Sequence, residues 1–128
     1  MKRIIAIVFL FLALITLATY EVVMVDKVIV KLENQVTSLS EMVKSNKEDL
    51  SIVETEISYV KKDWDSKEDN LCLMFNHKDL SAITDSLTRL KSYIYNNDYD
   101  NAVAEVDLLN EYARKNRHIM GFNMQNLL

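Results

Sequence analysis

The sequence predicts an all-α protein in which an N-terminal transmembrane helix is followed by an antiparallel bundle of three or four helices. Proline is absent and glycine occurs once, so the residues that mark turns and strand folds are nearly missing. An apolar stretch of membrane-spanning length opens the chain, and apolar residues then recur with a seven-residue repeat. The length of 128 residues allows one small domain plus one appendage.

Residues 1–25 are predicted to be a membrane anchor. Their apolar run follows Lys2 and Arg3 and reaches Val25, with Glu21 as its one charged residue. A bilayer core takes about 20 helical residues, so this run spans it if Glu21 reaches the headgroup region. Because positive charge precedes the run, we expect a single-pass protein of the cell membrane with its N-terminus in the cytoplasm and its C-terminal domain outside.

The alternative is a signal peptide cleaved near Thr16-Leu17-Ala18, which would release a secreted domain. Two features favour the anchor. The apolar run is longer than the core of a typical signal peptide, and the helical pattern continues into the next segment without a break.

Residues 26–120 are predicted to form the extracytoplasmic bundle. Apolar residues follow two rows at seven-residue spacing, typical of a packed helical seam. The rows are Ile29, Val36, Val43, Leu50, Ile57, Trp64, Leu71 and Leu32, Leu39, Asn46, Val53, Val60, Lys67, Met74. This repeat is compatible with one long rod, but a break at residues 45–47 is favoured. Ser45 is a good N-cap and Glu48 follows three residues later, which predicts helices over 26–44 and 47–75.

Two further helices are expected after a turn near Asn76, whose side chain can cap a helix. A second turn is expected at Asn96-Asn97-Asp98. The apolar faces of these helices are Leu80, Ile83, Leu87, Leu90, Ile94 and then Ala102, Val106, Leu109, Ala113. The last helix is expected to end at a C-cap on Gly121, leaving residues 121–128 as a short apolar tail.

The composition argues against several classes of site. The net charge of −4 gives no basic patch for nucleic acid, and one cysteine cannot form an internal disulfide or a metal knuckle. A single glycine also removes the glycine-rich loops that hold phosphates. We therefore expect no catalytic residue, no metal, no cofactor, no bound small molecule and no enzymatic activity.

Five residues are candidates for the core or for contact with a partner: Trp64, His77, Tyr93, Tyr95 and Tyr99. Trp64 lies on the first apolar row, which favours a core or interface position. His77 has no partner at the spacing of helical metal ligands, so we expect it at a helix end. The tyrosines cluster around the last predicted turn, where an exposed subset would form a contact patch.

The chain resembles domain-of-unknown-function family 4363, small membrane-anchored helical proteins of Gram-positive bacteria. The resemblance is carried by Trp64, by Phe75-Asn76-His77-Lys78-Asp79-Leu80, by Leu87 to Ile94, by Asn97-Asp98 and by Asn126-Leu127-Leu128. It implies one N-terminal anchor, a helical extracytoplasmic domain and no known catalytic residues. It also implies a multi-span membrane protein, often encoded beside such proteins, as a candidate partner. The acidic residue that usually follows the family's histidine matches Asp79 only with a one-residue offset.

We therefore expect an ectodomain that acts by protein–protein contact, as an accessory or structural partner of another membrane protein or by self-association. The alternative is a sensor for a small ligand or an ion, with a pocket around Asn46, Lys67 and His77. An enzyme would require Ser66 or Ser81 to be hydrogen-bonded to His77 in an open cleft.

Overall fold

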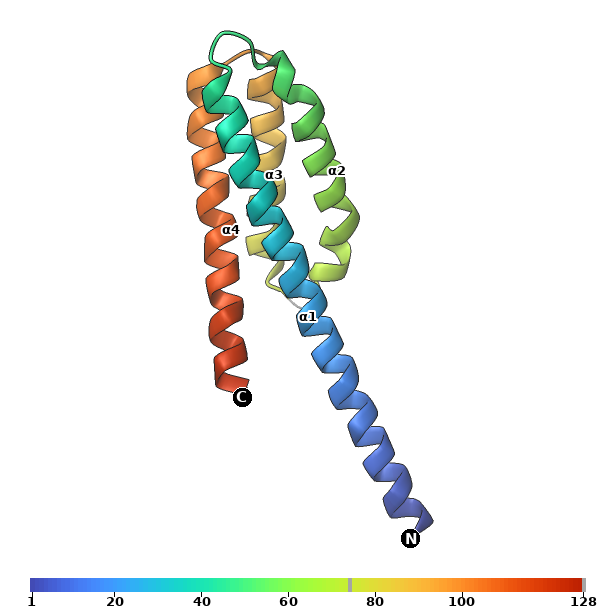
Figure 1. Cartoon of the computed structure of the whole chain (residues 1–128). Coiled ribbons are helices and arrows are strands. Elements are labelled where there is room, and N and C mark those ends of the chain that lie inside the picture. Colours follow the sequence, from blue (N-terminus) through green and yellow to red (C-terminus); the bar gives the residue numbers. More distant parts are fainter. Residues whose placement is uncertain (74, 128) are drawn as a thin grey trace.

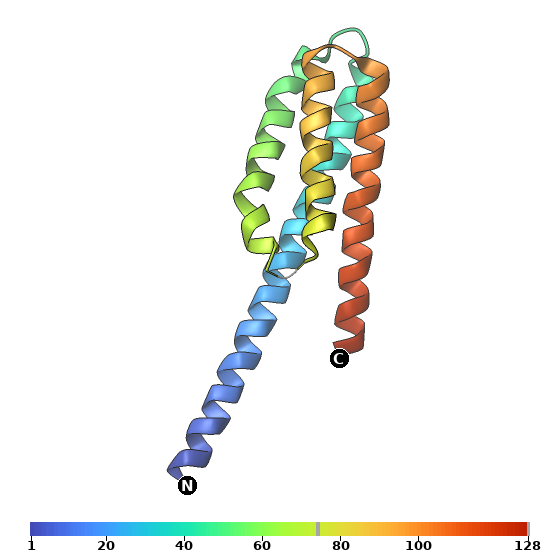
Figure 2. The ribbon, with the colours of Figure 1, turned by 180° about the vertical axis from the view of Figure 1, so that it is seen from behind.

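The computed structural model is an all-helical bundle, as the sequence predicts (Figure 1). It describes the backbone of residues 1–73 and 75–127 and the side chains of residues 1–73 and 75–118. Within this part of the chain the elements are α1 (Lys2–Ser45), the short 3-10 helix η1 (Leu50–Val53), α2 (Glu54–Leu71), α3 (His77–Tyr95) and α4 (Tyr99–Leu127). Neighbouring helices run antiparallel. Helix α1 packs between α4 and α2, and α3 completes the ring between the same two helices (Figures 1 and 2).

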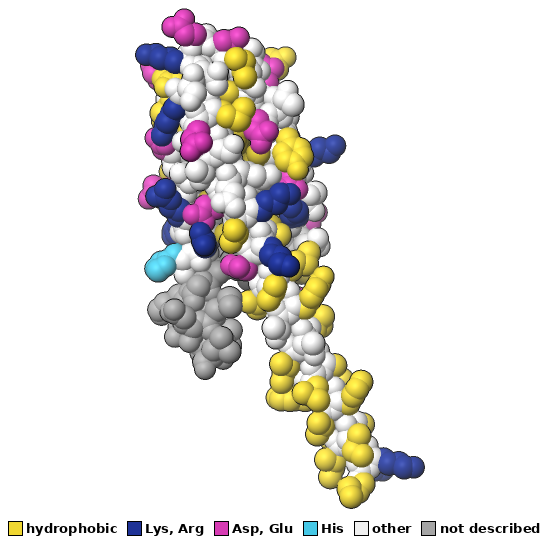
Figure 3. Space-filling view, viewed as in Figure 1, with side chains coloured by type: hydrophobic (Ala, Val, Ile, Leu, Met, Phe, Trp, Pro, Cys, Tyr) yellow, Lys and Arg dark blue, Asp and Glu magenta, His cyan; other side chains and the backbone are white. Residues whose placement is uncertain are grey.

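Helix α1 is one unbroken helix of 44 residues. At about 1.5 Å per residue it is about 66 Å long, and its first half projects away from the bundle (Figures 1 and 2). The projecting part is long and apolar enough to cross a membrane, which is a property that signal sequences share. Figure 3 shows hydrophobic side chains gathered on this part and charged side chains spread over the bundle.

The two seven-residue rows form the core, as predicted, apart from their polar members and Met74, which lies outside the described residues. The buried row members are Ile29, Leu32, Val36, Leu39 and Val43 in α1, and Leu50, Val53, Ile57, Val60, Trp64 and Leu71 in η1 and α2. Asn46 and Lys67, the polar members, are half-buried. The apolar faces predicted for α3 and α4 are buried as well, so all four helices turn their apolar sides to one core.

The predicted break between the first two helices is confirmed, but the capping residue is different. Ser45 is the last residue of α1, and the N-cap of η1 is Asp49, whose carboxylate accepts a hydrogen bond from Ser51 N at 2.9 Å. Several non-helical residues are needed here because the chain must reverse direction before Leu50 can enter the core. The start of α2 therefore lies beyond the expected residue 47.

The ends of α2 and α4 also differ from the prediction. Helix α2 ends at Leu71, not at residue 75, because the chain turns before the Asn76 side chain caps α3 through Lys78 N at 3.1 Å. The expected C-cap at Gly121 is wrong, since α4 continues to Leu127. A glycine inside a helix costs only about 1 kcal/mol relative to alanine, which is too little to end a helix by itself.

Asn97 links the two turns at the end of the bundle farthest from the N-terminus. Its backbone has a positive φ of 53°, a conformation that asparagine tolerates better than most residues. Its Oδ1 accepts a hydrogen bond from Leu50 N at 2.8 Å. The turn between α3 and α4 therefore supplies the acceptor for the first residue of η1.

Asn97→Ala is expected to lower the free energy of unfolding by about 1–3 kcal/mol, because it removes this acceptor and disfavours the left-handed backbone. Urea denaturation of the full chain in detergent, followed by circular dichroism, measures the loss. Asn96→Ala is the matched control, since Asn96 is exposed and its φ is −88°. Equal losses for the two variants would contradict the role assigned to Asn97.

Candidate functional site

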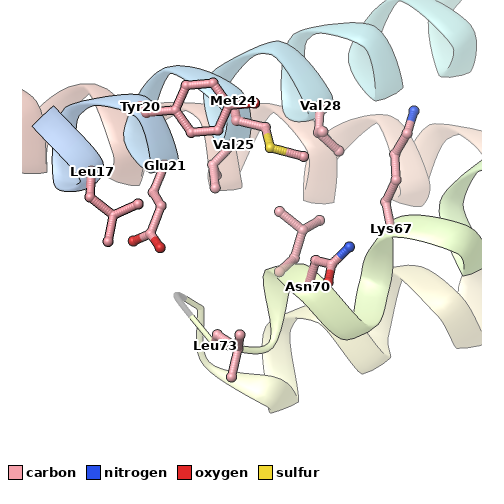
Figure 4. Close-up of a pocket in the computed structure, with 10 residues that line it drawn as sticks. Leu17, Tyr20, Glu21, Met24, Val25, Val28, Lys67, Asn70 and Leu73 are labelled. Carbon is pink, nitrogen blue, oxygen red and sulfur yellow. The ribbon is translucent and has the colours of Figure 1, made fainter.

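A groove lies where the projecting part of α1 meets the bundle, between α1 and the end of α2 (Figure 4). Its volume is about 390 Å³, and its lining is mainly apolar. The lining residues are Leu17, Tyr20, Glu21, Met24, Val25, Val28, Lys67, Asn70, Leu71 and Leu73. We call this feature the junction groove.

The junction groove exists because α1 continues past the point where α2 ends. Helix α2 ends at Leu71, and the connection to α3 carries Leu73 out of the core, where its side chain is 89% exposed. Figure 4 shows Leu73 on the opposite wall of the groove from the turn of α1 that contains Glu21 and Val25. Val25 is buried on the side of α1 that faces the bundle. Because α2 ends near this point, the same side of α1 is not covered by α2 closer to the N-terminus.

A cluster of charges joins α1 to α2 next to the junction groove. Asp63 accepts hydrogen bonds from Lys67 Nζ at 2.9 Å and from Lys31 Nζ at 3.0 Å, and Gln35 Nε2 approaches it at 3.4 Å. Partial burial acts to raise the pKa of Asp63, but the hydrogen bonds and charges of the two lysines outweigh it and hold that pKa below its usual value. The hydrogen bond with Asp63 raises the pKa of Lys31. One carboxylate thus faces two ammonium groups.

A buried carboxylate, Glu105, joins α3 to α4. Glu105 Oε1 accepts hydrogen bonds from Ser86 Oγ at 2.7 Å and from Arg89 Nη2 and Nε at 2.9 and 3.1 Å. This bonding to Glu105 raises the pKa of the Arg89 guanidinium. Sequence reasoning missed the cluster. The available signal was an acidic residue directly beside Ala102 and Val106 on an apolar face.

Trp64 lies in the core, where it connects α2 to α3. Its side chain is 2% exposed, and its Nε1 donates a hydrogen bond to Thr84 Oγ1 at 2.9 Å. A buried indole N–H needs such an acceptor, which Thr84 supplies from the neighbouring helix. Trp64 is therefore not part of an exposed contact surface in this structure.

His77 is exposed at the start of α3, and its Nδ1 lies 3.4 Å from Cys72 Sγ. The sequence gives no signal for this pair, because a five-residue separation brings side chains together only across a turn. Ser66, considered as a partner for His77, instead donates its hydroxyl to Asp63 O at 2.7 Å. Among the described side chains, no group of three His, Cys, Asp or Glu residues is placed to hold a metal ion.

The three candidate tyrosines lie around the turn between α3 and α4, far from His77 in the fold. Tyr93 and Tyr99 are half-buried against the core, whereas Tyr95 is 73% exposed. The Lys47 ammonium lies 5.6 Å from the centre of the Tyr99 ring, a cation–π contact between the two turns. The five candidate residues therefore do not form one site.

The model of the domain-of-unknown-function family DUF4363 matches residues 19–127. The chain belongs to this family. The DUF4363 region begins in the projecting part of α1 and contains the whole bundle and nearly all of the junction groove. No curated protein and no solved structure matches the chain.

Asp63→Asn is expected to remove an acid-sensitive contribution to stability. Because the folded pKa of Asp63 lies below the ordinary value of about 3.8, its ionised form stabilises the fold above that value. This stabilisation is lost as the pH falls through the lowered folded pKa. We expect a destabilisation of about 1 kcal/mol at neutral pH and a smaller one in acid, measured by urea denaturation.

Asp65→Asn is the matched control, because Asp65 is exposed and, among the described side chains, pairs only with Lys61 on its own helix, at 2.7 Å. Its effect on the free energy of unfolding should be close to zero, as is usual for such exposed pairs. A loss for Asp63→Asn that does not change with pH would contradict the role given to its charge.

Proposed function

We propose that this protein is a non-enzymatic, single-pass membrane protein whose bundle acts by protein–protein contact. In this proposal α1 anchors the chain with its N-terminus in the cytoplasm, and the bundle is an accessory or structural partner of another membrane protein on the outer side. The observation that supports it best is the continuity of α1, which carries an exposed apolar surface in its first half and buried core residues in its second.

The exposed surface of α1 supports anchoring. Phe9 and Phe11 are 75% and 65% exposed, and the neighbouring aliphatic side chains are about half exposed or more. A continuous apolar surface of this kind is unfavourable in water and marks a membrane or protein contact. Lys2 and Arg3 precede it, which favours a cytoplasmic N-terminus.

The end of the bundle farthest from the N-terminus supports contact with a partner. Two large apolar side chains are exposed there, Ile52 at 60% in η1 and Tyr95 at 73% at the end of α3. Exposed aromatic residues of this kind are common anchors of protein interfaces. We call these two side chains, with the turn at Asn96 and Asn97, the distal surface.

The sensor alternative has less support. Asn46 follows the end of α1, whereas His77 begins α3 at the other end of the bundle, so the groups expected to line a ligand pocket do not converge. A binding pocket needs several polar groups directed at one volume. Contact with a protein partner therefore remains the function that we propose.

The first experiment tests anchoring and orientation. In a Cys72→Ser background, Ile52→Cys should react with a membrane-impermeant maleimide in intact cells, because Ile52 is exposed at the outer end of the bundle. The protein should stay in carbonate-washed membranes, and mass spectrometry should find an uncleaved N-terminus. Cells that carry Cys72→Ser alone give the background. A secreted chain cut near Ala18, or labelling only after lysis, would contradict this part of the proposal.

The second experiment tests the partner. In-cell crosslinking of a C-terminally tagged chain and mild detergent extraction should recover a specific multi-span membrane protein. Tyr95→Ala should lower that recovery about tenfold, as loss of an interface anchor does. Tyr59→Ala is the control, since Tyr59 is 55% exposed on α2, outside the distal surface. Recovery of the tagged chain alone, monomeric or self-linked, would contradict the accessory role.

A further inference from the structure

The connection between α2 and α3 exposes a large apolar side chain at the end of the bundle that adjoins the projecting helix. Leu73, at 89% exposure, is the most exposed large hydrophobic residue among the described side chains of the bundle. Connections between helices are usually polar because they face water. A single exposed apolar residue is common on protein surfaces, so the position of Leu73 matters because it lines the same groove as apolar side chains of α1.

Leu73 shares its level along α1 with other exposed apolar side chains. It lies across the junction groove from the turn of α1 that contains Glu21 and Val25 (Figure 4), and Val23 and Met24 of that turn are each 46% exposed. The junction groove lies between these two elements, and its lining continues to Leu17 on the projecting part of α1. The α2–α3 connection and α1 thus both present apolar surface at the same position along the axis of α1.

The proposed anchoring determines the depth in the bilayer at which Leu73 and the neighbouring turn of α1 lie. If the hydrocarbon core starts at Ile4, about 17–20 helical residues bring its other edge to Tyr20 or Val23. The interfacial layer adds about 5–8 Å, or about three to five residues of helix. The turn from Glu21 to Val25, and with it Leu73, then lies in the interfacial layer, where apolar side chains of membrane-bound segments insert.

We propose that Leu73 and the junction groove form a second membrane contact, in which Leu73 inserts into the interfacial layer and a lipid acyl chain occupies the groove. This inference rests on the proposed anchoring but not on the proposed partner. Lipid is the chosen occupant because the groove is continuous with the surface of the spanning helix, so the lipids around α1 already adjoin it. Together with α1, this contact restrains the tilt and rotation of the bundle and thereby the direction that the distal surface faces.

The test uses the full chain in vesicles of phosphatidylglycerol and phosphatidylethanolamine at a high lipid-to-protein ratio. In a Cys72→Ser background, an environment-sensitive fluorophore is attached at Leu73→Cys or, as the matched control, at Ile52→Cys. Both native side chains are large, aliphatic and exposed, and they lie at opposite ends of the bundle. Each sample is quenched by aqueous iodide and, separately, by lipids with a nitroxide near the carboxyl end of the acyl chain.

The proposal expects iodide to quench the probe at residue 73 at least about threefold less than at residue 52, with the reverse order for nitroxide lipids. Equal iodide quenching in protein that floats with the vesicles would overturn the second contact and leave the anchor intact. Shielding from iodide without quenching by nitroxide lipids would also overturn it, and would assign the surface to a second copy of the chain. Protein that does not float with vesicles would refute the anchoring itself.

Discussion

The structure depends on the second half of α1, which supplies one complete side of the core. Ile29, Val36 and Val43 are fully buried there, with α4 packed on one flank of the helix and α2 on the other. Burial of apolar surface is the main favourable term in folding, at about 25 cal/mol per Å². Because the same helix continues without a break into the exposed apolar part, the bundle cannot rotate freely about a linker. Any tilt or rotation of the first half of α1 is therefore transmitted directly to the bundle.

Polar contacts fix how the helices are aligned along one another. Asp63 joins α2 to α1, and Glu105 joins α4 to α3. Two exposed pairs join α4 to α1, Lys44 with Asp107 at 2.8 Å and Arg117 with Glu33 at 2.9 Å. Such pairs add little stability when exposed, but each carboxylate finds its partners in only one alignment. The apolar seam thus supplies most of the stability, and the polar contacts specify the register.

The two ends of the bundle have different chemistry, which follows from the course of the chain. At the end nearest the N-terminus, α2 ends and α3 begins close to the projecting part of α1, and the lining of the junction groove there is mainly apolar. The other end carries the two turns that Asn97 links, with Tyr95 exposed beside them. In the orientation that we propose, the first end meets lipid and the second faces a partner. A single helical bundle can in this way connect a membrane surface to a protein surface.

The helical class, the apolar N-terminal helix and most core residues can be read from the order of the amino acids, because the spacing of apolar residues along a helix selects the face that is buried. The sequence favours a turn at residues 45–47 without deciding it, since a seven-residue repeat continues equally well through one rod or two paired helices. Four features emerge only from the folded chain: the cap at Asp49, the passage of α4 through Gly121, the Trp64–Thr84 hydrogen bond and the junction groove. The hydrogen bond and the groove join residues far apart in the chain, and their geometry is set by the path through the turns, which local periodicity does not encode.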